Sequence, residues 1–319
     1  MRSILLLLLA LAALWSGPGH AQGDYPSKPI QLLVGFPPGG GNDIMARLLG
    51  AKLQEAWRQP VVVVNKPGAT SIIAADFVAK APPDGYTLLV NASLMTIIPV
   101  VHSSLPYDTL RDFEPVTMLA DFPFVLAVHP SLKVHSVKEL VGVAKSQPGK
   151  LNYGAASTAF QLTAELFKQQ AGIDVNHIPY KGSAQSIKGL LANEVQLAFI
   201  DTPPMVSQIN SGRLRGLAVT SRVRSSSLPE LPTMIEAGVA DFEIVGWFAL
   251  FAPAGTPKPI VNKLYTESAK IVRMPDLREK LVNLGAAPVG NTPEELREIM
   301  KKQMNKWITV AKSANIKAN

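Results

Sequence analysis

Three consecutive glycines in the stretch GFPPGGGNDIMARLLGAKL (Gly35 to Leu53) stand between a short apolar run and an amphipathic pattern. This placement is typical of a strand that passes into a helix. The free N–H groups at a helix start point outward, the helix dipole adds partial positive charge, and glycine lets a ligand approach the backbone. Because ligands of open α/β sheets bind at this end of the strands, the turn predicts a site for an anion. A structural turn without a ligand is the alternative.

The residues that follow the glycines narrow the identity of the anion. Gly35 and Gly40 have the separation of the outer glycines in a Walker A loop, but Gly41 and Asn42 follow where Lys and Ser or Thr are needed. The Rossmann pattern G-x-G-x-x-G is also absent. A nucleotide is therefore disfavoured. We expect Asp43 to be the N-cap or a first-turn residue that accepts some helix N–H groups, which leaves room for one small anion such as a carboxylate.

A second turn of small residues lies at Tyr153 to Phe160 (YGAASTAF) and also leads from a strand pattern into a helical one. Ser157 or Thr158 is a natural N-cap, and either hydroxyl can face a ligand instead. Two such turns that face each other across a cleft would hold a small acid from both sides.

Polar residues follow two other predicted strands at the same edge. Asn91 to Ser93 follows a strand of the first half of the chain, and Asp201 to Pro204 follows a strand of the second half. The carboxylate of Asp201 can receive an amino group of a ligand, or it can bond to the local backbone. Phe36 and Trp247 can line a cleft or belong to the core.

Motifs of the common enzyme classes are missing. The chain has no cysteine, no G-x-S-x-G elbow and no H-E-x-x-H, and the histidines beyond the N-terminal segment are His102, His129, His135 and His177. We therefore expect no catalytic residues, no metal and no cofactor. A Ser-His-Asp triad assembled in space, as in an exported hydrolase of small esters, stays open because such triads are recognised by geometry.

The N-terminus indicates export. Met1 and Arg2 precede the apolar run ILLLLLALAAL, which is shorter than the roughly 20 residues that span a bilayer. We expect a cleaved signal peptide over residues 1–21 and a mature chain in the periplasm, with an uncleaved membrane anchor as the alternative. The net charge of +7 comes without dense basic patches, so nucleic acid is not expected as a partner.

Strand and helix patterns alternate along the chain. The first five predicted elements, strands and helices in turn, cover residues 30–34, 43–57, 61–64, 71–80 and 86–90. Within them, the four valines from Val61 to Val64 predict a buried strand. This βαβαβ start predicts a parallel sheet.

The alternation of strand and helix patterns resumes from residue 124. Turn-rich stretches lie at residues 115–123 and 224–241. We interpret these stretches as two crossings between two α/β lobes. Residues 22–123 and 246–319 are then expected to form lobe 1, and residues 124–245 lobe 2.

Nine short motifs, taken together and in order, resemble the extracytoplasmic substrate-binding receptors of tripartite tricarboxylate transporters, the Bug family. The resemblance covers nearly the whole mature chain. The motifs are Tyr25 to Ile30 (YPSKPI), Phe36 to Gly40 (FPPGG) with Asp43 and Ala46-Arg47, Asn65 to Ala69 (NKPGA), Pro83 to Leu88 (PDGYTL), Asn152 to Gly154 (NYG), His177 to Ser183 (HIPYKGS), Leu217 to Ser221 (LAVTS), Leu231 to Thr233 (LPT) with Glu236 to Gly238 (EAG), and Ala252 to Pro257 (APAGTP).

The resemblance implies a two-lobed periplasmic binding protein fold, type II-like, in which each lobe is a mixed, mostly parallel sheet flanked by helices. It implies a monomeric solute receptor without catalysis that closes on a di- or tricarboxylate, an amino acid or an aromatic acid, and whose partner is the membrane part of a transporter. A receptor that presents its closed form to a signalling protein is the alternative. The implied ligand contacts are Phe36, Gly39, Gly40, Asn42, Asp43, Ser93, Ala155, Ser157, Thr158 and Asp201.

Two departures from the family pattern bear on specificity. Family members usually carry a longer Gly/Ser-rich turn that ends in a His, whereas the turn from Ala155 to Phe160 is shorter and lacks both. The family also commonly has two glycines where this chain has Thr70 and Ser71. Because Phe160 replaces polar groups, we hypothesise a bulkier or more apolar ligand.

Overall fold

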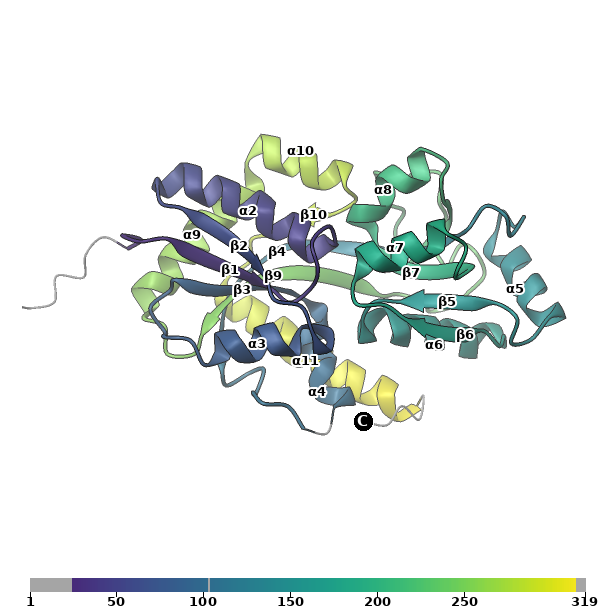
Figure 1. Cartoon of the computed structure of the whole chain (residues 1–319), viewed down its shortest axis with the longest axis horizontal. Helices are drawn as coiled ribbons and strands as arrows, with labels where there is room; N and C mark the ends of the chain where they lie inside the picture. Colours follow the sequence, from purple (N-terminus) through teal and green to yellow (C-terminus); the bar gives the residue numbers. More distant parts are fainter. Residues whose placement is uncertain (1–24, 103, 314–319) are drawn as a thin grey trace, which may run out of the picture.

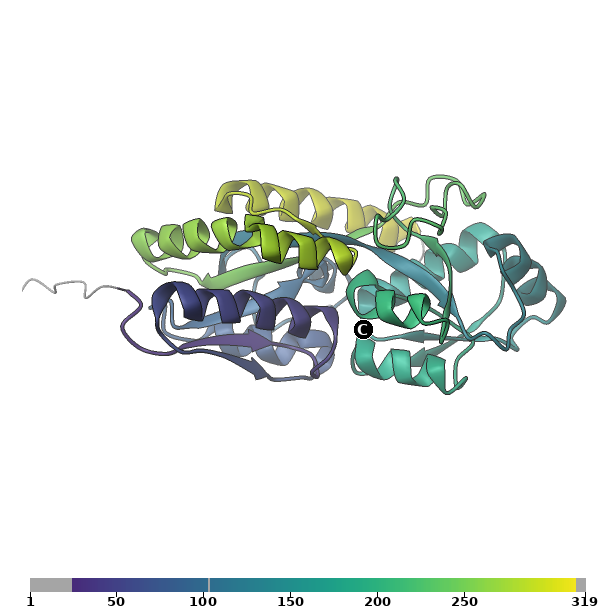
Figure 2. The ribbon, with the colours of Figure 1, turned by 90° about the horizontal axis from the view of Figure 1, so that it is seen from above.

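The computed structural model describes residues 25–102 and 104–313 and shows an elongated α/β molecule (Figures 1 and 2). Its strands form a continuous mixed sheet in the order β2-β1-β3-β9-β4-β7-β5-β6, with β10 and β8 also paired to β4. Helices flank this sheet, and the elements gather into two lobes at its two ends. Of the described helices, none combines the length and the apolar character needed to cross a bilayer. The expected signal peptide, residues 1–21, lies outside the described residues.

The first lobe starts with the alternation of strands and helices that the sequence predicts. Its elements are β1 (Ile30–Val34), α2 (Gly41–Trp57), β2 (Val61–Asn65), α3 (Ile72–Ala79) and β3 (Thr87–Ala92). Strand β1 lies between β2 and β3 and is parallel to both. Helix α2 buries one apolar stripe, formed by Met45, Leu49 and Leu53 at helical spacing, and therefore lies firmly on the sheet.

Strand β2 is the outermost strand of this end of the sheet, which makes the expectation of a buried strand at Val61 to Val64 wrong. The side chain of Val62 is 49% exposed, and its neighbours are only partly covered. A run of valines fits a pleated surface at an edge as well as at the centre of a sheet. The run therefore predicts the strand but not its position in the sheet.

The second lobe repeats the pattern around β5. Its elements are α5 (Val137–Ser146), β5 (Asn152–Ala155), α6 (Thr158–Ala171), β6 (Asn176–Pro179), α7 (Ser183–Leu191), β7 (Leu197–Asp201), α8 (Thr202–Asn210) and β8 (Arg215–Val219). Strand β5 is parallel to both β6 and β7. The carboxyl ends of β5 and β7 consequently lie at one edge of the sheet, next to the starts of α6 and α8.

Two long strands join the lobes. Strand β4 (Phe113–Val128) pairs with β9 (Val245–Pro253) up to Pro123, and from Phe124 onward it pairs with β7 and β8. The expectation that residues 115–123 form a turn-rich stretch is wrong, because the strand is continuous through this segment where it passes from one lobe to the other. A register shift after Pro115 lets the strand pass a residue that has no N–H to donate.

The remaining elements cover the first lobe and return to the junction. They are η1 (Ala69–Ser71), η2 (Ser93–Thr96), α4 (Ile98–Val101), α9 (Lys258–Arg273), α10 (Pro275–Asn283), β10 (Ala287–Pro288) and α11 (Pro293–Ser313). Helix α11 begins against β4 of the first lobe. Further along, Gln303, Lys306 and Trp307 lie beside Ala159 of α6, so this helix reaches the second lobe as well.

Candidate functional site

The glycine turn of the first lobe leads from β1 into α2, and Asp43 holds it in shape. Gly40 is the N-cap, and Gly39 has φ +91°, a conformation that favours glycine. Asp43 lies in the first helical turn, where its Oδ2 accepts the N–H of Gly39 at 2.9 Å and the Nε of Arg47 at 3.0 Å. Its Oδ1 accepts the Nδ2 of Asn65 at 2.9 Å. All of these contacts lie within the turn and its supports.

The charge of Asp43 is compensated locally. Burial raises the pKa of this carboxyl, but the hydrogen bonds from Arg47, Gly39 and Asn65 outweigh it and leave the pKa lowered. Asp43 is therefore ionised at neutral pH, and the guanidinium of Arg47 lies 2.9 Å from its Oδ1. The carboxylate stabilises the turn without presenting a net negative charge to a ligand.

The small-residue turn of the second lobe leads from β5 into α6. Ser157 is the N-cap, but its Oγ lies 3.5 Å from the N–H of Phe160, which is long for a hydrogen bond. Thr158 is the first helical residue, and Ala155 ends the strand. The hydroxyl of Ser157 is thus only weakly engaged by the helix and can donate to a ligand.

Asp201, at the end of β7, connects the two lobes. Its carboxylate is buried and accepts hydrogen bonds from the Oγ of Ser183 at 2.5 Å and from the backbone N–H of Gly41. Burial raises the pKa of Asp201 to about 6, and these hydrogen bonds counteract the effect only in part. A side chain of the second lobe therefore occupies one N–H donor at the start of α2, a donor that the sequence suggested for the ligand.

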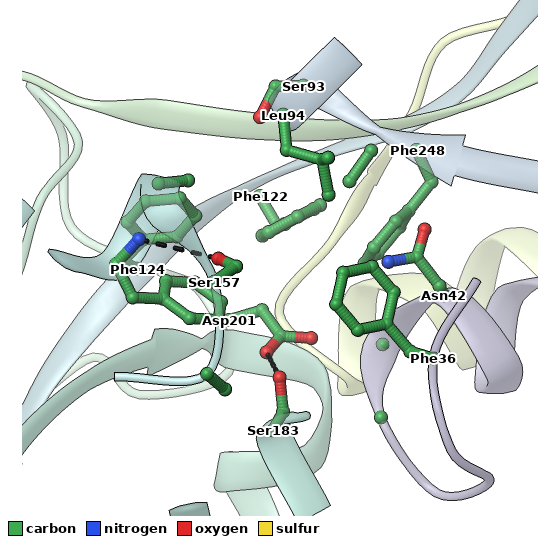
Figure 3. A pocket seen from close by; sticks show the side chains of 16 residues that line it. Phe36, Asn42, Ser93, Leu94, Phe122, Phe124, Ser157, Ser183, Asp201 and Phe248 are labelled. Carbon is green, nitrogen blue, oxygen red and sulfur yellow. Dashed lines mark hydrogen bonds between the residues drawn. The ribbon is translucent and has the colours of Figure 1, made fainter. Parts of the chain in front are cut away.

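The two turns and Asp201 enclose one cavity between the lobes (Figure 3). Six of the residues expected to contact a ligand line it: Phe36, Gly40, Asn42, Ser93, Ser157 and Asp201. Four others, Gly39, Asp43, Ala155 and Thr158, lie in the same turns but not in its wall. The structure thus brings the glycine turn and the second small-residue turn into a single crevice, as the sequence predicts.

Aromatic side chains form much of the cavity wall. Phe122 stacks on Phe248 with ring centroids 4.2 Å apart, and Phe124 meets Phe160 edge to face at 4.9 Å. Phe36 completes this group on the first lobe. Three of these rings were missed because the sequence interpretation treated residues 115–123, which include Phe122, as turn-rich and did not single out Phe124 or Phe248. The spacing of Phe122 and Phe124 by two residues was the available signal, since it puts both on one face of a strand.

Three polar side chains in the cavity have little or no bonding to the protein. Asn42 is 9% exposed, and its buried Oδ1 has no hydrogen-bond partner. The hydroxyl of Ser93 makes no hydrogen bond within the described residues, and that of Ser157 makes only the long one described above. No Lys or Arg of the described chain lines this cavity. Its polar groups can therefore bind a carboxylate through neutral donors only.

Comparison with known proteins shows to which family a chain of this architecture belongs. The model of the tripartite tricarboxylate transporter family receptor matches residues 45–316. The chain belongs to this family. Among relatives of the receptor, BugT of Bordetella pertussis is 37% identical over 301 residues, which cover 92% of this chain and 91% of BugT.

Solved structures show the same two-lobed fold. The R. palustris protein Rpa4515 with adipate has a TM-score of 0.89 and 36% identity, and the alignment covers 92% of this chain and 99% of that one. The periplasmic binding protein BugD has a TM-score of 0.89 and 33% identity, with the same coverage. The family consists of solute-binding receptors and not of enzymes. In keeping with this, His177 stacks on Tyr153 and does not line the cavity.

Proposed function

We propose that this receptor is a periplasmic protein that captures a small carboxylate with an apolar body in the cavity between its lobes and delivers it to the membrane subunits of a transporter. The observation that carries the proposal is the junction of two helix N-termini, of α2 and α6, at one cavity that is lined by the amide of Asn42, whose buried Oδ1 has no hydrogen-bond partner, and by the hydroxyl of Ser93, which makes no hydrogen bond within the described residues. Buried polar groups without partners are rare in folded proteins, so such groups in a cavity point to a ligand.

The polar groups of the cavity suit a carboxylate. Helix N-termini, hydroxyl groups and an amide bind an anion through hydrogen bonds without a full positive charge. The presence of adipate in the related protein Rpa4515 supports the same ligand class. The positions Phe36, Gly40, Asn42, Ser93 and Ser157 are proposed as contacts that attract the acid, and Asp201 is proposed as a neighbour that repels it while ionised. Gly39, Asp43, Ala155 and Thr158 are proposed to hold the two turns.

The apolar body is proposed from the phenyl rings. The rings of Phe248, Phe122, Phe124 and Phe160 form one continuous wall, because Phe122 and Phe124 also lie with ring centroids 6.0 Å apart. A hydrocarbon chain or an aromatic ring placed against them is removed from water, which contributes about 25 cal/mol per Å² of apolar surface buried. Hydrophilic acids that carry several hydroxyl groups gain nothing from these walls.

Ligand capture requires the lobes to move. The cavity measures about 30 Å³, whereas ligand pockets are typically roughly 300–1,000 Å³. We propose that residues 22–123 and 246–319 rotate against residues 124–245. The change of partners along β4 at Pro123 and Phe124 supports this division, because one strand serves both lobes there. Opening admits the acid, and contacts to both lobes then favour the closed form.

A ligand panel tests the proposal. The mature chain, from residue 22, is titrated with aliphatic, aromatic and hydroxylated acids and with neutral analogues, and binding is followed by thermal shift and calorimetry. We expect apolar carboxylates to raise the Tm and the matching amides to leave it unchanged. The double variant Asn42→Ala, Ser93→Ala should lose at least tenfold in affinity. Binding of sugars or amines, with no response to any acid, would contradict the function.

A further inference from the structure

A second cavity lies directly behind the first. Three residues, Ser93, Phe124 and Ala159, line both cavities and form the partition between them. The rest of its wall comes from the end of α11, from η2 and from the segment that enters β9; these residues are Ile97, Ile244, Val245, Gln303, Lys306 and Trp307. Since Ser93 and Ala159 are small, the ring of Phe124 is the main obstacle between the two spaces.

Hydrogen-bond donors without partners gather in this second cavity. The Oε1 of Gln303 accepts the Nε1 of Trp247 at 2.8 Å and the Oγ1 of Thr96 at 3.3 Å, which fixes the orientation of the amide. Its Nε2 makes no hydrogen bond within residues 25–102 and 104–313 and is left as a donor. The hydroxyl of Ser93, at the partition, is a second such donor.

Lys306 supplies the charge. It lies three residues after Gln303, so both side chains are on one face of α11. It forms no ion pair with any described residue, and it is the one Lys or Arg of the described chain that lines either cavity. No Asp or Glu of that part of the chain lines the second cavity. The second cavity therefore offers positive charge and donors, whereas Asp201 is the charged side chain of the first.

We propose that the second cavity is a subsite for the far carboxylate of an extended dicarboxylate, with Lys306 as its counter-ion and Gln303 and Ser93 as donors. This inference rests on the proposed function and names the ligand class more closely. The near carboxylate meets the turns of α2 and α6, the hydrocarbon chain lies between the phenyl rings, and rotation of Phe124 lets the far end pass Ser93. Short dicarboxylates fill the first cavity alone.

The test compares two acids of equal chain length, adipate and hexanoate, by calorimetry on the mature receptor. Variant Lys306→Gln removes the counter-ion, and Lys302→Gln is the matched control because Lys302, like Lys306, is exposed on α11 but lines neither cavity. We expect the wild type to bind adipate at least tenfold more tightly than hexanoate. Lys306→Gln should remove this preference and leave hexanoate within twofold, and Lys302→Gln should change neither affinity.

A second variant addresses the other donor. Gln303→Glu keeps an oxygen for the Nε1 of Trp247 and places a negative charge beside the subsite, so adipate should bind at least tenfold more weakly and hexanoate should not. Equal affinities of the wild type for the two acids, or an unchanged preference in Lys306→Gln, would overturn the inference while leaving the receptor function intact. If the wild type binds no acid at all, both the inference and the proposed function fail.

Discussion

The carboxylate of Asp201, at the end of β7 in the second lobe, accepts a hydrogen bond from the backbone N–H of Gly41, the first residue of α2 in the first lobe. The hydroxyl of Ser183 holds the same carboxylate from the other side. A buried acid thus closes the cavity and lies at the helix start that attracts anions. A ligand carboxylate that enters the cavity meets the charge of Asp201 at close range.

Carboxylate affinity is therefore expected to depend on pH. Because burial raises the pKa of Asp201 to about 6, the side chain becomes neutral as the pH falls through that value, and its repulsion of a bound carboxylate ends. We expect the affinity for a monocarboxylate to rise by about tenfold from pH 8 to pH 5, measured by calorimetry. Asp201→Asn should bind tightly at both values and show no pH dependence.

Ser183→Ala provides the control for this prediction. The hydrogen bond from Ser183 lowers the pKa of Asp201, so its loss should move the midpoint of the affinity change to higher pH. A wild-type affinity that is flat between pH 5 and pH 8 would show that ligand and Asp201 do not interact.

The free energy of unfolding of the ligand-free receptor should also depend on the titration of Asp201. The pKa of Asp201 is higher in the folded chain than its usual 3.8, so the folded state binds the proton more strongly than the unfolded state. Stability then falls as the pH rises from below 3.8 through about 6. Urea unfolding of the wild type and of Asp201→Asn isolates this contribution. The amount by which the free energy of unfolding of Asp201→Asn exceeds that of the wild type should grow with pH over that interval. A difference that shrinks with rising pH would contradict the sign.

The contribution of Asp43 to stability should depend on pH in the opposite direction. Its pKa is lowered in the folded state, so its contribution is present above the usual pKa and is lost as the pH falls through the lowered value. Asp43→Ala removes the acceptor for Gly39 and leaves Arg47 and Asn65 without their bonds. We expect a loss of about 1–3 kcal/mol in the free energy of unfolding and weaker acid binding, measured by denaturation and calorimetry. Glu298→Ala, which removes only an exposed ion pair with Lys301, should cost far less.

Much of the fold could be predicted from local patterns. The glycine turn, the cap at Ser157 and the alternation of strands and helices place α2 and α6 correctly, because helix starts depend on a few neighbouring residues. The same patterns brought Gly40 and Ser157 to one cavity. Their contact with a ligand stays a prediction.

What could not be predicted depends on long-range pairing. Strand β4 continues through Pro115 and Pro123 because β9 supplies partners along its length, with bulges where the register shifts. The sequence of residues 115–123 alone predicts a turn-rich stretch, since proline usually interrupts a central strand. Phe122 lies within the stretch that was interpreted as a turn and was missed with it, and Phe124, just beyond that stretch, was not singled out as part of an aromatic wall. The contact of Asp201 with Gly41 was also hidden, since 160 positions separate the two residues.

The loop after β2 offers a test of backbone strain. Ala69, Thr70 and Ser71 all have positive φ, with values of 45°, 52° and 75°, which L-residues with a β-carbon adopt at a cost. Thr70→Gly should therefore raise the free energy of unfolding by about 0.5–1 kcal/mol, because relief of this strain outweighs the extra freedom that glycine has in the unfolded chain. Thr70→Ala loses the branch but keeps the β-carbon. Its free energy of unfolding should lie between those of the wild type and of Thr70→Gly. A destabilised Thr70→Gly variant in chemical denaturation would contradict this account.

Phe160 is expected to set the preference for apolar acids. Its ring meets Phe124 edge to face and lines the cavity where family members carry polar groups, as the resemblance implies. Phe160→Ser should weaken binding of a phenyl-bearing acid by roughly tenfold to a hundredfold, since about 1.5–3 kcal/mol is lost when a large apolar side chain no longer covers its partner. Hydroxylated acids of similar size should be affected by less than threefold.

Phe77→Ser, at a ring that is 46% exposed on α3 and does not line the cavity, should leave both affinities unchanged. Equal losses for phenyl-bearing and hydroxylated acids in Phe160→Ser would show that the ring supports the fold of the turn and does not select the ligand.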